Sequence, residues 1–234
     1  LHGQDLGAFR ISTVLNIVLV VVEAGVGIAI GSMALLADAG HNLSDVAGLA
    51  SAWAGGMAGR LAPDSRHTYG WRRASILAAF ANAILLLVAM GSLAWEAIER
   101  LRVPVHTEGL TMIAVAAVGV VINGATAMLF MSGRSRDLNI RSAFLHMAAD
   151  ALVSLGVVAA GALYLWTRWT WLDPVASLAI AVVIVVGTWR LFRQSLHLMF
   201  DGVPDSVDLE EVRAYLLSQP GVEDVHDLHI WAIS

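Results

Sequence analysis

Long apolar stretches with almost no charge constrain the fold of this chain more than any other feature of its sequence. Five such stretches stand out, at residues 11–59, 74–95, 109–133, 142–167 and 174–189. A membrane-spanning helix needs about 20 mostly apolar residues. The first stretch is long enough for two helices that turn near Gly31 and Ser32, and the last extends toward Leu198. The pattern therefore predicts an all-α membrane protein with a six-helix transmembrane bundle.

Composition agrees with this fold class and excludes others. Apolar residues make up 58% of the chain and charged residues 14%, about half the share of a soluble domain. We therefore expect neither a disordered chain nor a nucleic-acid-binding protein. The sequence contains no cysteine, so disulfides are excluded. A bound metal ion must use imidazole, carboxylate, carbonyl or water ligands.

The distribution of arginines predicts the orientation in the membrane. With six spans, three arginines fall on one side, namely Arg100, Arg102 and Arg168. Ten fall on the other side, namely Arg10, Arg60, Arg66, Arg72, Arg73, Arg134, Arg136, Arg141, Arg190 and Arg193. Loops rich in basic residues stay in the cytoplasm. We therefore expect both termini to be cytoplasmic.

The composition changes after Phe200, and the remaining residues suggest a separate domain. We expect a linker, then a short helix that is capped by Asp205 or Ser206 and runs to about Ser218, and a strand over residues 222–231. About 34 residues are too few for a stable core. Together with a first residue that is not methionine, this suggests a fragment that ends within a small α/β domain.

Two matching motifs inside the predicted spans are the strongest candidates for chemistry. His41 and Asp45 lie in the second span, and His146 and Asp150 repeat the same spacing in the fifth. An i, i+4 pair shares one helical face, with about 6 Å between the residues along the axis. These two spans run in opposite directions, so packing them face to face brings two imidazoles and two carboxylates together. That ligand set suits Zn²⁺ in tetrahedral geometry.

Several alternatives remain open at this stage. Each His–Asp pair can instead be an intrahelical hydrogen bond that only fastens helices together. Asp38 is either a pathway residue beside the site or a solvated residue near a helix start. Glu23 is either a proton carrier or the partner of an arginine. The asparagines of spans one, three and four are more consistent with interhelical hydrogen bonds than with metal ligands, namely Asn16, Asn82 and Asn123.

Four segments in the same order resemble the cation diffusion facilitator family of cation-efflux transporters. They are residues 35–45, with the sequence LLADAGHNLSD, residues 69–78, the 146–150 motif, and residues 221–231. The resemblance covers nearly the whole chain and is similar to the zinc-transporting branch, which has His first in the span-two motif.

The resemblance implies a homodimer that exports Zn²⁺ from the cytoplasm in exchange for protons. It implies a transporter, not an enzyme, and no organic cofactor. It assigns His41, Asp45, His146 and Asp150 to the transport site. It also implies a transmembrane domain over residues 1–200, and the beginning of a ferredoxin-like cytoplasmic domain over residues 201–234. A bacterial inner membrane is the expected location.

Two further metal positions follow less directly from the resemblance. His226 matches a metal ligand of some members. Asp64 and His67 match part of a loop site whose second histidine is replaced here by Trp71, so we expect a solvated loop there.

Two other classes of function stay open from the residues alone. A membrane-embedded metalloenzyme needs a general base, and its usual His-Glu-x-x-His motif is absent from this sequence. A channel or a purely structural protein would use the pairs only for packing. Among transported ions, Cd²⁺, Co²⁺, Ni²⁺ and Mn²⁺ remain possible beside Zn²⁺, because ligand type biases metal choice without fixing it.

Overall fold

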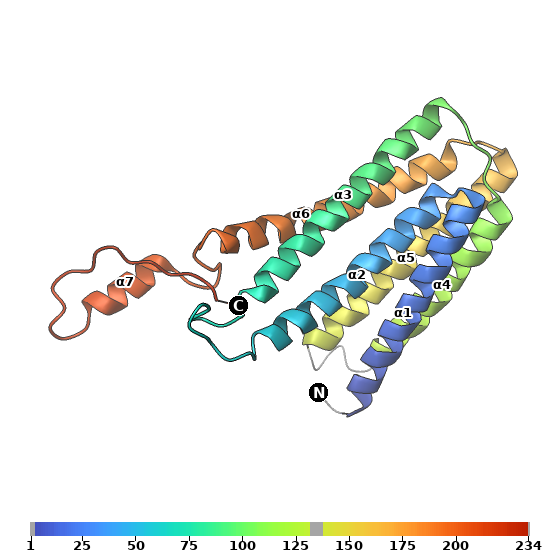
Figure 1. Ribbon diagram of the computed structural model, residues 1–234. Helices are drawn as coiled ribbons and strands as arrows, with labels where there is room; N and C mark the ends of the chain where they lie inside the picture. The colour runs from blue at the N-terminus through green and yellow to red at the C-terminus, as the bar shows by residue number, and fades with distance from the viewer. Residues whose placement is uncertain (1–2, 132–137, 234) are drawn as a thin grey trace. The chain divides into compact units, whose positions relative to one another are not determined.

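The computed structural model describes residues 3–131 and 138–233, and all regular elements within these ranges are α-helices (Figure 1). Arg134 and Arg136, which enter the orientation argument, lie outside the described residues. The helices are α1 (Gly3–Ile30), α2 (Met33–Ala58), α3 (Ala74–Arg102), α4 (Gly109–Met131), α5 (Leu138–Thr167), α6 (Leu172–Met199) and α7 (Leu209–Leu217).

The chain divides into two compact units. The first comprises Leu1–Ala47 and Leu86–Gly187, and the second comprises Gly48–Leu85 and Thr188–Ser234. Within the first unit, α1, α2, α4 and α5 form a bundle (Figure 1). The candidate residues of both His-x-x-x-Asp motifs belong to this unit.

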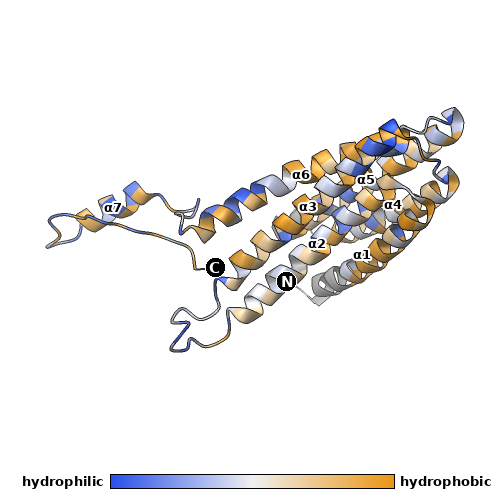
Figure 2. Ribbon diagram, turned by 45° about the horizontal axis from the view of Figure 1, so that its top comes forward, coloured by the Kyte–Doolittle hydropathy of each residue, from blue (hydrophilic) through white to orange (hydrophobic). Residues whose placement is uncertain are grey.

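Five of the described helices are long and apolar enough to cross a membrane, namely α1, α3, α4, α5 and α6. In Figure 2, α1 and α4 are mostly hydrophobic along their length, whereas α7 mixes hydrophobic and hydrophilic residues. Helix α2 has 26 residues and is long enough, but it is not among the five. Asp38, His41, Asn42 and Asp45 lower its hydropathy. The helix that departs from the apolar pattern is therefore one that carries candidate site residues.

The core of the first unit joins α2, α4 and α5 through small and medium apolar side chains. Its buried members are Ala34, Leu35, Met112, Ala116 and Val157. Helices in a membrane associate through close packing of small residues, because lipid supplies no hydrophobic driving force between them.

Two glycines bring α4 and α5 especially close. A Cβ atom at Gly161 would lie 2.7 Å from Ile113, and one at Gly109 would lie 2.8 Å from Tyr164. Both distances are too short for an added methyl group without movement. This contact fixes α5, and with it the second His-x-x-x-Asp motif, against α4.

The turn between α1 and α2 occurs at Gly31 and Ser32, as predicted. Gly31 has a φ of 67°, the left-handed conformation that ends many helices and that glycine adopts without strain. The guanidinium of Arg100 donates a hydrogen bond to the Gly31 carbonyl. The end of α1 is thus stabilised by a side chain from α3.

Asp173, at the start of α6, caps the beginning of α2. Its carboxylate accepts hydrogen bonds from Ser32 Oγ at 2.7 Å, from the Met33 backbone N at 2.8 Å and from the Ala34 backbone N at 3.2 Å. These backbone groups have no partner within their own helix. Asp173, which is far from α2 in the sequence, therefore accepts the hydrogen bonds that the N-cap residue of a helix usually accepts.

We expect Asp173→Ala to lower the free energy of unfolding by about 1–3 kcal/mol, because it leaves buried donors without an acceptor. The midpoint of thermal unfolding in detergent measures the effect. Asp173→Asn keeps one acceptor oxygen and should lose less. A wild-type midpoint for Asp173→Ala would contradict the capping role.

Three sequence expectations need correction. Helix α3 does not end near Trp95 but continues to Arg102, and an i, i+4 pair between Arg100 and Glu96 (2.6 Å) supports its charged last turns. The cap of α7 is Asp208 rather than Asp205 or Ser206. Its carboxylate accepts hydrogen bonds from the backbone N–H groups of Glu210 and Glu211.

The strand expected over residues 222–231 is absent, since residues 222–233 have no regular secondary structure. A strand is stabilised by hydrogen bonds to a neighbouring strand. The described part of the chain contains no strand with which this segment can pair.

Candidate metal site

The two His-x-x-x-Asp motifs meet inside the first unit. His41 and Asp45 lie on α2, and His146 and Asp150 lie on α5. His41 Nε2 is 3.0 Å from Asp150 Oδ1, and His146 Nε2 is 3.2 Å from Asp45 Oδ2. Each histidine therefore contacts the aspartate of the opposite helix.

These contacts differ from the intrahelical pairs considered as an alternative. Within the motifs, which the structure describes in full, the intrahelical contact is between His146 Nε2 and Asp150 Oδ2; it measures 3.8 Å and is longer than either contact across the helices. The i, i+4 spacing thus presents each pair to the facing helix. The groups converge on a common point and do not close on their own helices.

Two of the distances between these groups, His41 to Asp150 and His146 to Asp45, are close to the edge of a coordination tetrahedron. With metal–ligand bonds of about 2.0–2.1 Å, tetrahedral ligand atoms lie about 3.3 Å apart. Ligand atoms of His41, Asp45 and Asp150 all lie within 4.8 Å of one another. His146 is outside that group, and its ring centroid is 6.3 Å from that of His41. Its imidazole must move inward before all four groups surround one ion.

The four side chains differ in how much of their surface is exposed. Asp150 is 1% exposed, whereas His146 is 43% exposed and Asp45 and His41 are 23% and 20% exposed. His146 lies near the beginning of α5, whereas Asp45 lies at the middle of α2 and is about as exposed as His41. The exposure of the cluster is thus greatest at the His146 imidazole.

Comparison with known protein families shows to which family the chain belongs. Residues 9–200 match the cation efflux transmembrane domain, which is most of the chain. The chain belongs to the cation efflux family. Residues 204–234 match the cytoplasmic domain of cation efflux proteins. The family resemblance inferred from the motifs is thereby confirmed.

Characterised relatives of the cation efflux family are similar over nearly the whole chain. Zinc transporter ZitB of Escherichia coli (strain K12) is 40% identical over 214 residues, which are 91% of this chain and 68% of the relative. Metal cation efflux system protein CzcD of Cupriavidus metallidurans is 37% identical over 232 residues, 99% of this chain and 73% of the relative. The cadmium, cobalt and zinc/H(+)-K(+) antiporter of Bacillus subtilis is 31% identical, covering 100% of this chain and 77% of the relative.

Family membership determines the general class of activity. The protein is a multi-pass integral membrane protein and a cation-efflux transporter, and it is not an enzyme. Both the all-α membrane fold and the transporter class predicted from sequence are confirmed.

The structure shows the surroundings of two acidic residues, Asp38 and Glu23, for which the sequence allowed two interpretations each. Asp38 is fully buried and accepts a hydrogen bond from Ser154 Oγ at 2.9 Å, so the solvated alternative is wrong. Glu23 is also fully buried, and its partner is the amide of Asn42 at 3.1 Å, not an arginine. Ser154 and Asn42 were not singled out from sequence, although each lies within one turn of a motif residue.

The asparagines expected to join helices behave differently from one another. Asn16 Nδ2 contacts Met147 Sδ at 3.7 Å, which links α1 to α5 beside His146. Asn123 on α4 is fully buried, and neither atom of its amide has a hydrogen-bond partner among the described residues. The interhelical role is thus observed for Asn16 and not for Asn123.

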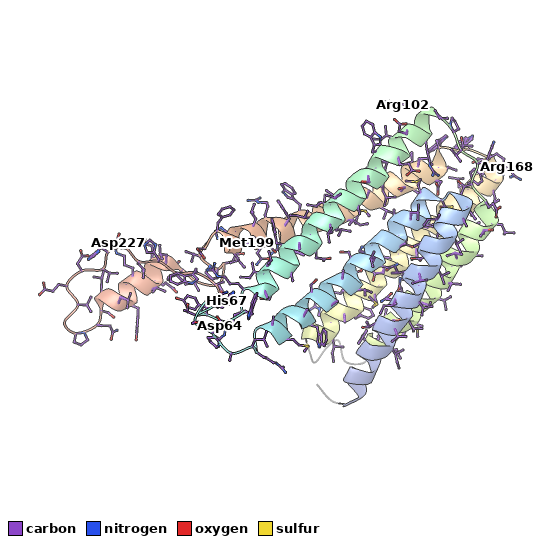
Figure 3. All side chains as sticks on the ribbon, viewed as in Figure 1. Asp64, His67, Arg102, Arg168, Met199 and Asp227 are labelled. Atoms are coloured by element: carbon purple, nitrogen blue, oxygen red, sulfur yellow. The ribbon has the colours of Figure 1, made fainter. Side chains whose placement is uncertain are left out.

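Asp64 and His67 form a local turn in the loop between α2 and α3 (Figure 3). His67 Nδ1 lies 3.1 Å from the Asp64 carboxylate, and the His67 ring packs against Trp71 with centroids 4.4 Å apart. The His67 side chain, together with the backbone N–H groups of His67 and Arg66, lowers the pKa of Asp64. The carboxylate is thus occupied by local hydrogen bonds, and no third possible metal ligand joins the pair within the described residues.

We expect Asp64→Ala to transport zinc at a rate within about twofold of wild type, because the Asp64 carboxylate is exposed and serves only its own turn. Zinc uptake into vesicles measures this rate. A loss of tenfold or more would show that the loop contributes to transport.

Proposed function

We propose that the protein exports Zn²⁺ from the cytoplasm in exchange for protons, and that His41, Asp45, His146 and Asp150 bind the ion during transport. The observation that carries this proposal is the reciprocal pairing of the two motifs across α2 and α5, at 3.0 and 3.2 Å. Two imidazole nitrogens and two carboxylate oxygens form a ligand set that suits zinc. The names of the relatives point to the same substrate, with cadmium and cobalt as further candidates.

Charge neutralisation explains why such a site can work inside a membrane. A divalent ion in a low-dielectric interior is costly unless its charge is balanced. The carboxylates of Asp45 and Asp150 together cancel the charge of one divalent ion. The neutral cluster can then face either side of the membrane without carrying a net charge through the lipid.

Competition between metal and protons supplies the coupling. Zinc binds the deprotonated imidazole, so binding releases protons and protonation releases zinc. Free imidazole titrates near pH 6.5, within the physiological range. In the proposed cycle, zinc displaces protons on the cytoplasmic side, the helices rock, and protons displace zinc on the opposite side.

The exposed side of the cluster supports entry from the cytoplasm. His146, the most exposed of the four side chains, lies near the beginning of α5. Arg168 follows the last residue of α5 and lies at the same end of the first unit as Arg102, the last residue of α3 (Figure 3). The arginine count assigns those two residues to the non-cytoplasmic side. The accessible side of the cluster therefore faces the cytoplasm in the proposed orientation.

Other parts of the proposal concern assembly and location. We propose a homodimer in a bacterial inner membrane, with both termini cytoplasmic. The match of residues 204–234 to a cytoplasmic domain supports this topology. A transmembrane domain over residues 1–200 and a cytoplasmic domain that begins at residue 201 remain predictions.

Zinc flux into proteoliposomes under an imposed pH gradient tests the proposal. Purified protein is reconstituted with a zinc-sensitive dye inside, and the external zinc concentration is varied. We expect saturable uptake that requires an acidic interior, together with alkalinisation of that interior. Flux that neither saturates nor depends on the pH gradient would identify a channel instead.

A further inference from the structure

A second group of buried polar side chains lies next to the His–Asp cluster in the first unit. It contains Glu23 on α1, Asp38 and Asn42 on α2, Asn123 on α4 and Ser154 on α5. All five residues are at most 1% exposed. None of them is the histidine or the aspartate of a His-x-x-x-Asp motif, although Asn42 lies between His41 and Asp45.

Hydrogen bonds and one glycine bring these side chains together. Asn42 Nδ2 donates to Glu23 Oε2 at 3.1 Å, and Ser154 Oγ donates to Asp38 Oδ2 at 2.9 Å. A Cβ atom at Gly119 would lie 3.0 Å from both Glu23 Oε1 and Ser154 Oγ. The two hydrogen-bonded pairs therefore lie close together, and the missing side chain of Gly119 lets both approach the backbone of α4.

Several polar atoms of this group have no hydrogen-bond partner among the described residues. They are Glu23 Oε1, Asp38 Oδ1, Asn42 Oδ1, and both amide atoms of Asn123. Asn123 follows Gly119 by one helical turn, so it lies on the same face of α4. Buried polar atoms are almost always partnered, and five together indicate that something else binds them.

The charge of the group specifies what it can bind. Within the described residues, no arginine or histidine nitrogen lies within 4.0 Å of the Glu23 or Asp38 carboxylate, since no ion pair includes either residue. Two carboxylates in a buried site must either take up protons or be balanced by a cation. The atoms available as metal ligands are carboxylate, amide and hydroxyl oxygens. Hard divalent cations such as Ca²⁺ and Mg²⁺ prefer these ligands.

We propose that Glu23, Asp38, Asn42, Asn123 and Ser154 form a second cation site that binds a hard divalent cation through oxygen atoms alone. Binding there requires no occupancy of the His–Asp cluster. The two sites differ in their donors, since this one offers no imidazole. It therefore favours hard cations where the cluster favours zinc.

The position of this oxygen site also suggests a part in transport, which rests on the proposed function. Asp38 lies three residues before His41, toward the beginning of α2, and Ser154 lies four residues after Asp150, toward the end of α5. Both displacements lead to the same end of the antiparallel helix pair, the one assigned to the outer side. A zinc ion leaving the cluster toward this end passes an oxygen site that holds it more weakly and so favours release.

Equilibrium dialysis with radioactive calcium tests the binding itself. The purified full chain in detergent is freed of metal by a chelator and then dialysed against Ca²⁺. We expect saturable binding of one Ca²⁺ per chain, weakened at least tenfold by Glu23→Gln or Asp38→Asn. The double variant Asp45→Asn and Asp150→Asn, which disables the His–Asp cluster, should bind Ca²⁺ like wild type.

A glycine pair on α4 provides a matched control that leaves every charge in place. Gly119→Ala puts a methyl group 3.0 Å from two of the proposed ligands, whereas a Cβ atom at Gly124 contacts nothing within 4 Å. We expect Gly119→Ala to weaken calcium binding and Gly124→Ala to leave it unchanged. Thermal unfolding of each variant without calcium shows whether it is folded.

Two results would overturn this proposal. One is a wild-type protein that binds no calcium saturably. The other is calcium binding that the Asp45→Asn and Asp150→Asn changes abolish but Glu23→Gln and Asp38→Asn do not. Zinc transport is measured separately on the same preparations, so a failure of the oxygen site is distinguishable from a failure of the proposed zinc export.

Discussion

Asp150→Ala should reduce proton-driven zinc uptake at least about 100-fold. The side chain is 1% exposed and lies 3.0 Å from His41 and 3.8 Å from His146, so it contacts both imidazoles of the cluster. Alanine removes one ligand and one of the two charges that neutralise the ion. Mutations of groups that merely orient ligands cost 10–100-fold, and loss of a ligand should cost at least as much. Initial uptake rates in proteoliposomes measure the effect.

Two controls separate this loss from misfolding. Asp64→Ala removes an exposed carboxylate from a loop and should transport normally. Asp150→Asn keeps the size and one acceptor oxygen but lacks the charge, so it should fold and still fail to transport. Near-wild-type uptake by both Asp150 variants would remove Asp150 from the transport site.

Zinc binding should weaken steeply as the pH is lowered, because protons and Zn²⁺ compete for the imidazole nitrogens of His41 and His146. A protonated imidazole has no lone pair for the metal, so the affinity is highest at high pH and is lost as the pH falls. If both His41 and His146 must lose a proton, the affinity falls by up to about 100-fold per pH unit. Titration of the detergent-solubilised protein against a zinc chelator, from pH 5.5 to 8, measures this slope.

Single histidine variants test which groups produce the slope. His146→Ala should bind zinc more weakly and should show about half the wild-type pH dependence, because one titrating ligand remains. His106, an exposed histidine in the loop between α3 and α4, provides the control, and His106→Ala should titrate like wild type. Affinity that is constant across this range would contradict imidazole ligation.

The long helices could be predicted from sequence because lipid leaves few choices for an uncharged apolar stretch. The α1–α2 turn at Gly31 was identifiable in the same way, since glycine ends helices readily. The end of α3 could not be predicted in this way, because its last turns are charged. Arg100 in these turns contacts Glu96 and the Gly31 carbonyl, and the contact with Gly31 depends on the fold. The strand after residue 221 was also wrong, because an extended sequence pattern supplies no partner strand.

The convergence of the candidate site was predictable for a specific reason. Identical i, i+4 motifs on two antiparallel helices place matching groups at similar depth, and the structure brings them within hydrogen-bonding distance. The pairing of His41 with Asp150, across helices, depends on their lateral packing and could not be read from spacing. The same holds for Glu23, which lies near Ser154 of α5 because α1 and α5 both pack against Gly119 of α4.

Anomalous diffraction at the zinc absorption edge tests the central claim most directly, because it locates the ion itself. Crystals of the protein grown with one equivalent of Zn²⁺ should show an anomalous peak between α2 and α5. We expect it within about 2.0–2.2 Å of nitrogen atoms of His41 and His146 and oxygen atoms of Asp45 and Asp150. Bound zinc that appears only elsewhere, with no peak among these four side chains, would contradict the account.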